Sequence, residues 1–296
     1  MSIFRVRHAF VEPRGSRSLS EWLFTSDLHG QTSLYEQLVA VVAAHHPRAV
    51  LIGGDLCPHA GGADGPRHQR LFLEGFLVEF ARRMREASSG LELLLMMGND
   101  DWAANDDVLA RHDGDLWRAL HDRVLDVDGV RVAGLSWVPI TPFGIKDWER
   151  WDDGADESPV RLDGFVSRGG SLTPHRFDPA RRSPTIADAL ESLAARTLPK
   201  ETVFVLHSPP HGTRCDMIGA QAHVGSRAIR SFADRHQPPL VLSGHIHESP
   251  RVSSSYRDMI GRTVAVNPGQ FGSSRLCGVW FDPARVDETL RHTVYG

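Results

Sequence analysis

Five short apolar segments, each followed within a residue or two by a polar side chain that can bind a metal ion, constrain the fold of this 296-residue chain most strongly. Their length and composition predict β-strands, and their apolar residues at successive positions indicate burial on both faces. A parallel sheet covered by helices gives strands this pattern, and the polar residues then gather at the carboxyl ends of the strands. The segments span residues 22–27, 49–55, 91–99, 202–207 and 240–247.

The stretches between the first three segments are amphipathic at helical spacing, over residues 32–46 and 70–86. Helices there would link neighbouring parallel strands as βαβ units. The second stretch carries an apolar stripe with Phe72, Phe76 and Phe80, which we interpret as core rather than as a cofactor site. The N-terminal half therefore predicts a parallel sheet covered by helices.

The C-terminal half predicts two more helices and a second, more antiparallel sheet. One helix spans residues 183–196, with Ser183 as N-cap and Pro184 as the first helical residue, which is a favourable starting pair. The other begins at Ser226 and is stopped by Pro238. Three further strands are expected to close the second sheet, at residues 263–267, 276–282 and 289–295.

Residues 139–183 break this pattern, since proline, glycine and charged residues are frequent there and no periodicity persists. We interpret the stretch as an insertion within a single domain of residues 1–296. Loops of this length in compact proteins are usually functional or partly disordered. Two interpretations stay open: a flap that faces the substrate, or a surface insertion with a small core of its own.

The composition argues against several classes of protein. Lys and Arg number 33 against 37 for Asp and Glu, and the resulting formal charge of −4 argues against electrostatic binding of nucleic acid or of a membrane surface. The 3 cysteines are widely spaced and odd in number, so no disulfide framework is indicated. The N-terminal residues lack the apolar run of a signal peptide, and no segment approaches the roughly 18 apolar residues of a membrane span. We therefore expect a cytoplasmic protein.

Polar motifs at the ends of the five apolar segments carry the candidate chemistry. Each motif alone is common in proteins. Their occurrence together, in this order and each at the end of a predicted strand, is the specific signal. The motifs are Asp27-Leu28-His29, Gly53-Gly54-Asp55, Gly98-Asn99-Asp100, His207 and Gly244-His245-Ile246-His247.

This pattern resembles the calcineurin-like metallophosphoesterase superfamily, whose signature runs D-x-H, G-D, G-N-H-[DE], H and G-H-x-H. The chain looks similar to the Icc-related phosphoesterases of that superfamily in the segments HSPPHGTRCD, HVGSRAI, SGHIHESP and VNPGQ, and the resemblance covers about residues 21–282. It implies an α/β fold, a four-layer αββα sandwich of two mixed β-sheets flanked by helices. It also implies a dinuclear metal centre between the sheet ends.

The resemblance implies seven metal ligands, with Asp55 as the bridge between two ions. Such a set of imidazole and oxygen donors without thiolates favours Mn²⁺, Fe²⁺, Zn²⁺ or Ni²⁺ over Ca²⁺, and we take Mn²⁺ as the leading candidate. His245 and His247 would share one face of an ideal strand, so their binding to different ions implies that the backbone leaves strand geometry there, which Gly244 permits. The remaining ligands would be Asp27, His29 and His247 for the first ion, and Asn99, His207 and His245 for the second.

The third motif departs from the family pattern, because Asp100 stands where many members have a histidine that protonates the leaving group or stabilises the transition state. A carboxylate beside two cations should have a lowered pKa, so we expect Asp100 to bind metal or to orient a neighbouring group. Two loop histidines, His59 and His211, are better candidates for the acid. Arg214 and His223 are candidates for contacts to the phosphate.

We therefore expect a phosphoesterase that hydrolyses a phosphomonoester or phosphodiester by attack of a hydroxide bridging two divalent metals. Its partner would be a small phosphorylated substrate, for which a small nucleotide is one candidate, and neither a nucleic-acid polymer nor a membrane is expected. A protein Ser/Thr phosphatase is disfavoured, because the GDxxDRG motif is absent and LCPHAGG follows Asp55. The alternative is a non-catalytic metal-binding scaffold or regulatory module on the same fold, which would typically have lost ligands.

Overall fold

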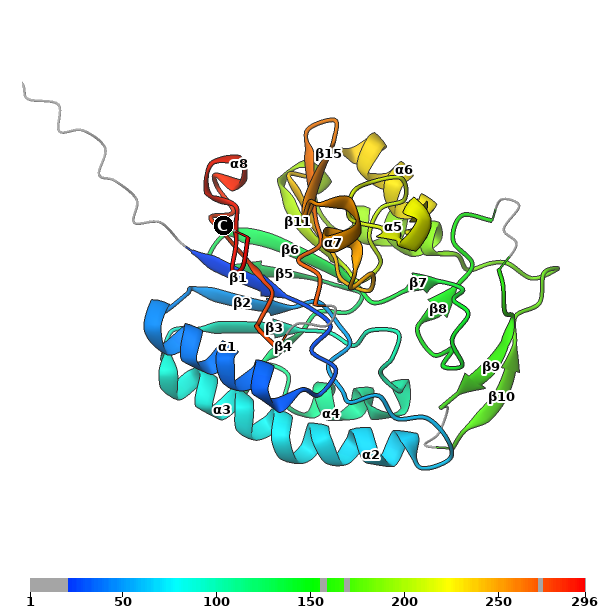
Figure 1. The fold of residues 1–296 in the computed structure, drawn as a ribbon, viewed down its shortest axis with the longest axis horizontal. Coiled ribbons are helices and arrows are strands. Elements are labelled where there is room, and N and C mark those ends of the chain that lie inside the picture. The colour runs from blue at the N-terminus through cyan, green and yellow to red at the C-terminus, as the bar shows by residue number, and fades with distance from the viewer. Residues whose placement is uncertain (1–20, 155–158, 168–170, 271–273, 296) are drawn as a thin grey trace, which may run out of the picture.

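Two six-stranded β-sheets lie face to face in the computed structural model of this chain (Figure 1), which describes residues 21–154, 159–167, 171–270 and 274–295. The strand order is β18-β17-β1-β2-β3-β4 in the first sheet and β15-β16-β14-β11-β6-β5 in the second. Both sheets are mixed, because parallel strands are joined by antiparallel strands at one edge of the first sheet and at both edges of the second. The predicted pair of mixed sheets is confirmed.

The first sheet is built around four parallel strands, and β17 continues it by pairing antiparallel with β1. The register places Phe24 of β1 beside Leu51 of β2, and Leu51 beside Leu94 of β3. The strands of this sheet are β1 (Trp22–Thr25), β2 (Ala49–Ile52), β3 (Glu92–Leu95), β4 (Arg118–Ala119), β17 (Val279–Phe281) and β18 (Arg291–His292).

The second sheet has β6, β11, β14 and β16 in parallel at its centre, with β5 and β15 antiparallel at its two edges. Parallel neighbours require crossover connections, which α6 provides between β11 and β14. The strands are β5 (Arg123–Val127), β6 (Val130–Leu135), β11 (Thr202–Leu206), β14 (Leu240–Leu242), β15 (Arg257–Ile260) and β16 (Thr263–Val266).

Helices cover the outer face of each sheet and complete four layers. On the first sheet, α1 (Thr32–His45) and α3 (Val78–Ala87) pack side by side, and on the second α5 (Ile186–Ala194) packs beside α6 (Arg227–His236). Figure 1 shows these two pairs on opposite sides of the sheets. The α/β fold class and the αββα sandwich expected from the sequence are therefore confirmed.

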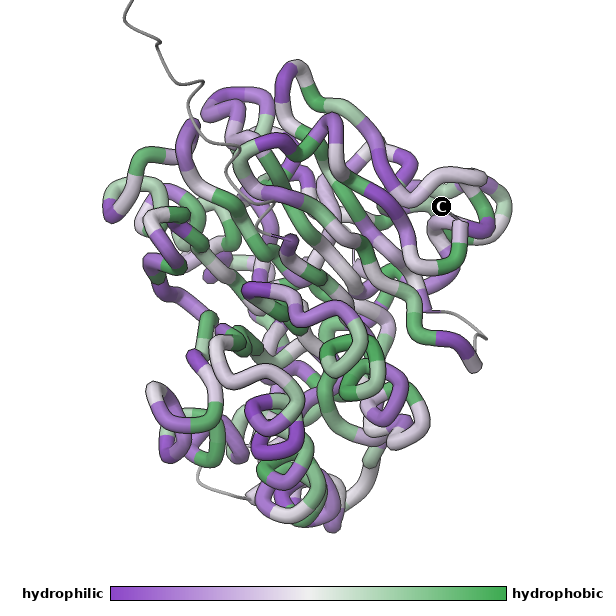
Figure 2. The backbone as a smooth tube through the Cα atoms, turned by 90° about the vertical axis from the view of Figure 1, so that its left-hand side faces the viewer, coloured by the Kyte–Doolittle hydropathy of each residue, from purple (hydrophilic) through white to green (hydrophobic). Residues whose placement is uncertain are grey.

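Strand β11 shows why the sequence folds into layers. Val203 and Val205 point into the core between the two sheets, whereas Phe204 and Leu206 point into the core beneath α5 and α6. All four side chains are buried, and removing such a side chain from water contributes about 1.5–3 kcal/mol. Hydrophobic residues run along the central strands in Figure 2 for this reason.

The helical segment between β2 and β3 contains one irregular turn. A π-helical stretch, η1 (Phe72–Leu77), separates α2 (Gly65–Leu71) from α3 and shifts the helical register. The rings of Phe72, Phe76 and Phe80 all pack around Tyr35 of α1, at centroid distances of 5.8, 5.4 and 4.8 Å. The interpretation of these phenylalanines as core is confirmed.

Two local expectations from the C-terminal half are wrong. Helix α5 begins two residues later than predicted, because Thr185 and not Ser183 is its N-cap. Thr185 and Asp188 each accept a hydrogen bond from the backbone N–H of the other. Strands β17 and β18 belong to the first sheet, because β17 pairs with β1. Helix α6 begins after its N-cap Ser226, as predicted.

Residues 139–183 form a subsidiary region around two small sheets. Lys146 and Glu149 are fully buried within it, with Nζ and Oε2 2.7 Å apart. Trp148 and Trp151 are also buried, so these two side chains do not face a substrate. The small sheets pair β7 (Val138–Pro139) with β8 (Glu149–Arg150), and β9 (Asp163–Val166) with β10 (Thr173–Arg176).

Among the described residues, no helix combines the length and apolar character needed to cross a lipid bilayer.

Short elements connect the layers of the fold. The short elements not yet named are η2 (Ala103–Asn105), α4 (Asp106–Arg111), η4 (Pro199–Glu201), β12 (Met217–Ile218), η5 (Gly219–Gln221), β13 (Ala222–His223), α7 (Ser249–Ser253) and α8 (Val286–Thr289).

Candidate metal centre

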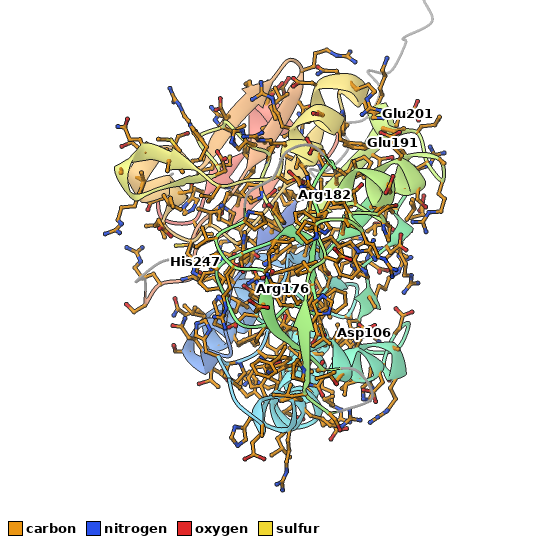
Figure 3. All side chains as sticks on the ribbon, turned by 90° about the vertical axis from the view of Figure 1, so that its right-hand side faces the viewer. Asp106, Arg176, Arg182, Glu191, Glu201 and His247 are labelled. Atoms are coloured by element: carbon orange, nitrogen blue, oxygen red, sulfur yellow. The ribbon has the colours of Figure 1, made fainter. Side chains whose placement is uncertain are left out.

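The carboxyl ends of five strands, three from the first sheet and two from the second, meet at one edge of the sandwich. The loop after each of these strands carries at least one of the seven predicted ligands. His247 lies where the blue and cyan half of the molecule meets the yellow and orange half (Figure 3). The ligands are Asp27 and His29 after β1, Asp55 after β2, Asn99 after β3, His207 after β11, and His245 and His247 after β14.

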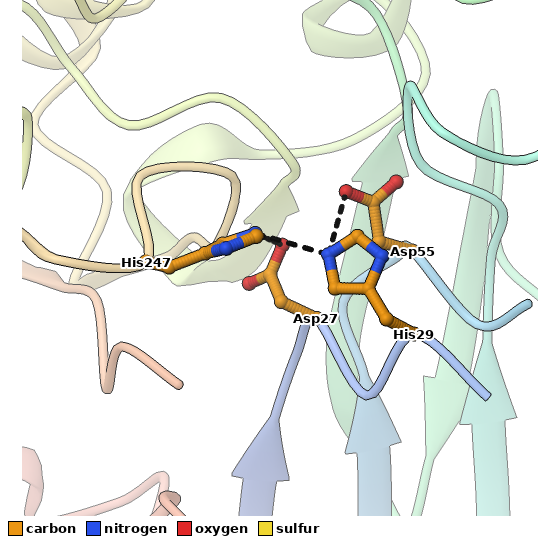
Figure 4. Close-up of side chains that lie close together, drawn as sticks. All are labelled: Asp27, His29, Asp55 and His247. Atoms are coloured by element: carbon orange, nitrogen blue, oxygen red, sulfur yellow. Dashed lines mark hydrogen bonds and ion pairs between the residues drawn. The ribbon is translucent and has the colours of Figure 1, made fainter. Parts of the chain in front are cut away.

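Four of these side chains form a compact cluster, with one ligand atom from each within 4.8 Å of the others (Figure 4). His29 Nε2 lies 3.1 Å from His247 Nε2 and 3.6 Å from Asp55 Oδ2. His247 Nε2 lies 3.2 Å from Asp27 Oδ1. The structure thus brings together the four groups that the sequence predicts for the first ion.

The other three side chains are linked to the same Asp55 carboxylate and to one another. His207 Nε2 lies 3.5 Å from Asp55 Oδ2 and 3.1 Å from Asn99 Oδ1. His245 Nδ1 lies 2.6 Å from the same Asn99 oxygen. One oxygen atom, Asp55 Oδ2, therefore lies within 3.6 Å of an imidazole nitrogen from each group, as a bridging ligand would.

The backbone adopts an unfavourable conformation at four of the seven predicted ligands. Asp27, His29, Asp55 and His245 have φ angles of 60°, 43°, 50° and 64°, in the left-handed region that residues with a side chain rarely occupy. Such conformations cost about 1–3 kcal/mol each and cluster at functional sites. Strand β14 ends at Leu242 and His245 adopts this left-handed conformation, so the expectation that the backbone leaves strand geometry before His247 is confirmed.

Two glycines allow the loops to approach the cluster closely. A Cβ atom on Gly98 would collide with the Asp55 carboxylate and with the His207 ring. A Cβ atom on Gly244 would likewise collide with the side chain of Asp27. Gly244 therefore lets its loop approach the side chain of Asp27 closely. The left-handed backbone conformation is adopted by the next residue, His245.

The electrostatics of the cluster favour bound cations. Burial opposes ionisation of Asp55, but the neighbouring rings of His207 and His29 hold the pKa of its carboxyl well below the usual range. Burial also opposes the charged form of His29, yet Asp100 and the other carboxylates raise the pKa of this ring to about 9. Burial and the nearby His207 lower the pKa of His245 to about 3, so this ring is a neutral donor.

The donor set fits divalent metal ions. Two facing imidazole nitrogens, of His29 and His247, can share only one proton, whereas an ion between them would accept a lone pair from each. The complete set offers four imidazoles, three carboxylate or amide groups and no thiolate, which suits borderline divalent cations. The seven residues named above would hold such ions, and Asp55 would contact both.

Asp101 is a buried carboxylate that the sequence reasoning did not single out. Its oxygens accept hydrogen bonds from the backbone N–H groups of Leu56, Cys57 and Gly98, at 3.0, 2.8 and 2.8 Å. It therefore ties the loop after β2 to the loop after β3 and positions Asp55 without contacting the cluster. The signal was present, because Asp101 occupies the final acidic position of the G-N-H-[DE] pattern.

Asn267 has a similar role on the second sheet. Its side-chain amide lies 3.1 and 3.0 Å from the carbonyl oxygens of Gly244 and Ile246, to which it donates. It thereby holds the loop that carries His245 and His247. Sequence reasoning missed this residue, since an Asn after a buried strand is most often a turn residue.

Two of the candidate catalytic residues lie next to the cluster. The His59 ring stacks on that of His29 at a centroid distance of 4.1 Å, and its Nδ1 contacts the Asp100 carboxylate. Asp100 Oδ2 also lies 3.4 Å from His29 Nδ1, and the Asp100 N–H donates to Asp55 Oδ1. These contacts place Asp100 as a group that orients both histidines.

The other candidates gather elsewhere. His223 Nδ1 lies 2.7 Å from Asp216 Oδ1, and the His211 ring centroid lies 5.9 Å from that of His223. The backbone N–H of Arg214 donates to Asp258. None of His211, Arg214 and His223 is among the described residues that line the cavity at the cluster.

The comparison with known proteins agrees with this geometry. The sequence matches the model of the calcineurin-like phosphoesterase family over residues 22–249, which is well over half of the chain. The chain belongs to this family. Its members act on phosphoesters with the aid of divalent metal ions. No curated protein matches the chain in sequence.

Solved structures share the fold of this family member. The protein TT1561 of Thermus thermophilus is 17% identical, with a TM-score of 0.57, and the match covers 93% of this chain and 98% of that one. A dimetal phosphatase of Danio rerio is 11% identical, with a TM-score of 0.51, and the match covers 88% of this chain and 92% of that one. At these low identities the similarities support the fold alone.

Proposed function

We propose that this family member hydrolyses phosphomonoesters or phosphodiesters with two divalent ions, Mn²⁺ foremost, held by the seven residues of the metal cluster. The observation that carries the proposal is the position of Asp55 Oδ2, 3.6 Å from His29 Nε2 and 3.5 Å from His207 Nε2. A carboxylate shared in this way offsets the repulsion of two cations about 3.5–4 Å apart, the spacing of two-metal hydrolases. The attacking group would be water and the products an alcohol and a phosphate.

The ions would supply the positive charge that an anionic phosphate requires and would acidify the attacking water. The residues of this chain position the reaction. Asp27 and Asp55 fix the imidazoles around the cluster through the contacts described above, and Asp100 fixes the ring of His59. His59 lines the cavity beside His29, and we propose that it protonates the leaving oxygen.

The proposed substrate is a small phosphorylated molecule and not a nucleic-acid polymer, because the chain carries a net charge of −4. A small nucleotide was one candidate from the sequence. We also propose a cytoplasmic location, on the basis of the cysteine usage described above.

The proposal is tested by hydrolysis of p-nitrophenyl phosphate and bis-p-nitrophenyl phosphate by the full chain with Mn²⁺. We expect Asp55→Asn and His245→Ala to lose at least 10²-fold in kcat/KM, together with bound manganese measured by elemental analysis. Matched surface variants, Asp128→Asn and His68→Ala, should retain wild-type rates and metal content. Wild-type protein no faster than Asp55→Asn would refute the enzyme assignment.

The same experiment addresses the non-catalytic alternative. Protein that retains two ions per chain but hydrolyses neither ester, nor any member of a wider panel of phosphate esters, would be a metal-binding module. The retention of all seven predicted ligands in one cluster supports the enzyme instead.

A further inference from the structure

A cavity of about 1140 Å³ opens directly onto the metal cluster and exceeds what a phosphate group needs. Small-molecule sites commonly measure about 300–1,000 Å³. Five residues of the metal cluster line the cavity together with residues of several loops: His29, Asp55, Asn99, His245 and His247. The remainder of the cavity therefore indicates which groups accompany the phosphate in the substrate.

The walls beyond the metal cluster are apolar. They are contributed mainly by residues 139–145 and by Pro159, Val160, Phe165 and Leu172 of the subsidiary region, with Ile218 and Val224 from another loop. Four of the eight large apolar side chains that are exposed in the described part of the chain lie here: Phe143, Val160, Phe165 and Val224. Contiguous exposed apolar surface of this kind marks a binding site, since scattered apolar residues would not converge on one cavity.

The charges of the cavity exclude a highly phosphorylated ligand. The described residues that line it include no Lys or Arg, and Glu248 adds a negative charge at the rim. A diphosphate or triphosphate chain is usually bound by Arg, Lys or backbone N–H groups in addition to metal ions. The cavity suits a substrate with a single phosphate, held at the metal cluster.

Two of the polar side chains away from the cluster, Thr141 and Trp102, are already engaged. The Thr141 hydroxyl donates to Glu149, and the Trp102 Nε1–H donates to the Ala60 carbonyl oxygen at 2.8 Å. A nucleobase placed against these walls would leave its own donors and acceptors without side-chain partners, which is costly in a desolvated pocket. An alkyl chain has no such requirement.

We propose that the substrate is a phosphoester that carries a long alkyl or acyl chain, with the phosphate at the metal cluster and the chain along the apolar walls. This inference rests on the proposed function and names its substrate class. It also gives the subsidiary region a role, because its inner surface, including Phe143, Val160 and Phe165, binds the chain of the substrate.

The test is a series of p-nitrophenyl alkyl phosphates with methyl, butyl and octyl groups, assayed below their aggregation limits with Mn²⁺-loaded protein. Water adds to phosphorus and p-nitrophenolate leaves, so only the retained alkyl group varies. Each methylene group that is fully removed from water increases the binding constant by a factor of about 4. Since chains are only partly buried, we expect kcat/KM to rise at least tenfold from methyl to octyl, and equal values would overturn the inference.

Exposed wall residues allow a variant test that spares the core. Phe143→Asp and Val160→Asp change side chains that are 57% and 89% exposed. We expect each to reduce the octyl-to-methyl ratio of kcat/KM at least threefold. Leu198→Asp, a matched change at a residue that is 54% exposed and not among those lining the cavity, should retain the wild-type ratio. A ratio unchanged in both wall variants would overturn the inference.

Binding gives a second readout that does not depend on turnover. Calorimetric titration with octylphosphonate and methylphosphonate should show at least tenfold tighter binding of the octyl compound by Mn²⁺-loaded wild type, and Phe143→Asp should diminish this difference. Equal affinities would overturn the inference. If none of the three alkyl esters is hydrolysed, and neither p-nitrophenyl phosphate nor bis-p-nitrophenyl phosphate is hydrolysed, the proposed function fails. Hydrolysis of the esters without any gain from the chain refutes only the substrate class.

Discussion

Asp101→Asn is expected to weaken metal binding although Asp101 is not a predicted ligand. In the wild type, Oδ2 accepts the N–H groups of Leu56 and Gly98, and Oδ1 accepts that of Cys57. The amide nitrogen of Asn donates, so in either orientation at least one buried N–H would face another donor. A buried donor left unsatisfied costs about 1–3 kcal/mol, and we expect the free energy of unfolding to fall by this amount.

The same change should move Asp55 and therefore the metal cluster. Loss of a residue that orients a metal ligand typically costs about 10–100-fold in affinity or activity. We expect this loss in the dissociation constant for Mn²⁺, measured by calorimetric titration, and in kcat/KM. Urea unfolding of the metal-free protein measures the stability separately.

Asp113→Asn is the matched control, because Asp113 also accepts a backbone hydrogen bond, from Ala119 at 2.8 Å, and pairs with Arg123. It does not line the described cavity. We expect it to lose stability while it retains wild-type affinity for Mn²⁺. Wild-type metal affinity and activity in Asp101→Asn would refute the positioning role of Asp101.

Three further predictions follow from individual contacts. His59→Ala should lower the rate about 10²-fold for esters with alkyl leaving groups, which need a proton, but less than tenfold for p-nitrophenyl esters; equal losses on both would exclude His59 as the acid. The Nδ1 atom of His121 accepts a hydrogen bond from the Ser136 N–H, and burial lowers the pKa of this ring from 6.5 to about 4. The stability that its neutral form contributes is therefore complete above pH 6.5 and is lost as the pH falls towards 4; in urea unfolding, the wild type should lose about 1.4 kcal/mol more per pH unit than His121→Gln in this window, and parallel profiles would contradict this. Gly98→Ala places a methyl group against Asp55 and should destabilise the protein by about 1–3 kcal/mol in calorimetry with lower manganese content, whereas an unaltered melting temperature and metal content would show that the loop adjusts freely.

The layers of the fold could be predicted from the sequence because burial on both faces leaves a strong pattern. The segments around β1, β2 and β11 are apolar at successive positions, and their polar ends converge where parallel strands require. The N-cap Ser226 was also predictable, since a side chain that accepts the Ile229 N–H is a local interaction.

Long-range and competing interactions could not be predicted in the same way. Nothing local in β17 indicates that it pairs with β1 at the opposite end of the chain. Ser183 and Thr185 are both good N-caps, and the reciprocal bonds with Asp188 decide between them.

In the candidate site, too, some features could be predicted from the sequence and others could not. Motifs identified the ligands, because metal-binding residues lie at fixed places in each motif. The neighbours of those ligands depend on how separate loops meet. The contact of His59 with Asp100 and the contact of His211 with His223 therefore could not be read from the sequence. The apolar cavity also required the structure, because its walls come from segments that are far apart in the sequence.

Anomalous scattering at the manganese edge from crystals grown with Mn²⁺ is the most direct test of the shared carboxylate. We predict two peaks about 3.5–4 Å apart on either side of Asp55, one beside His29 and His247 and the other beside His207 and His245. A single peak, or peaks that do not contact Asp55, would contradict the account.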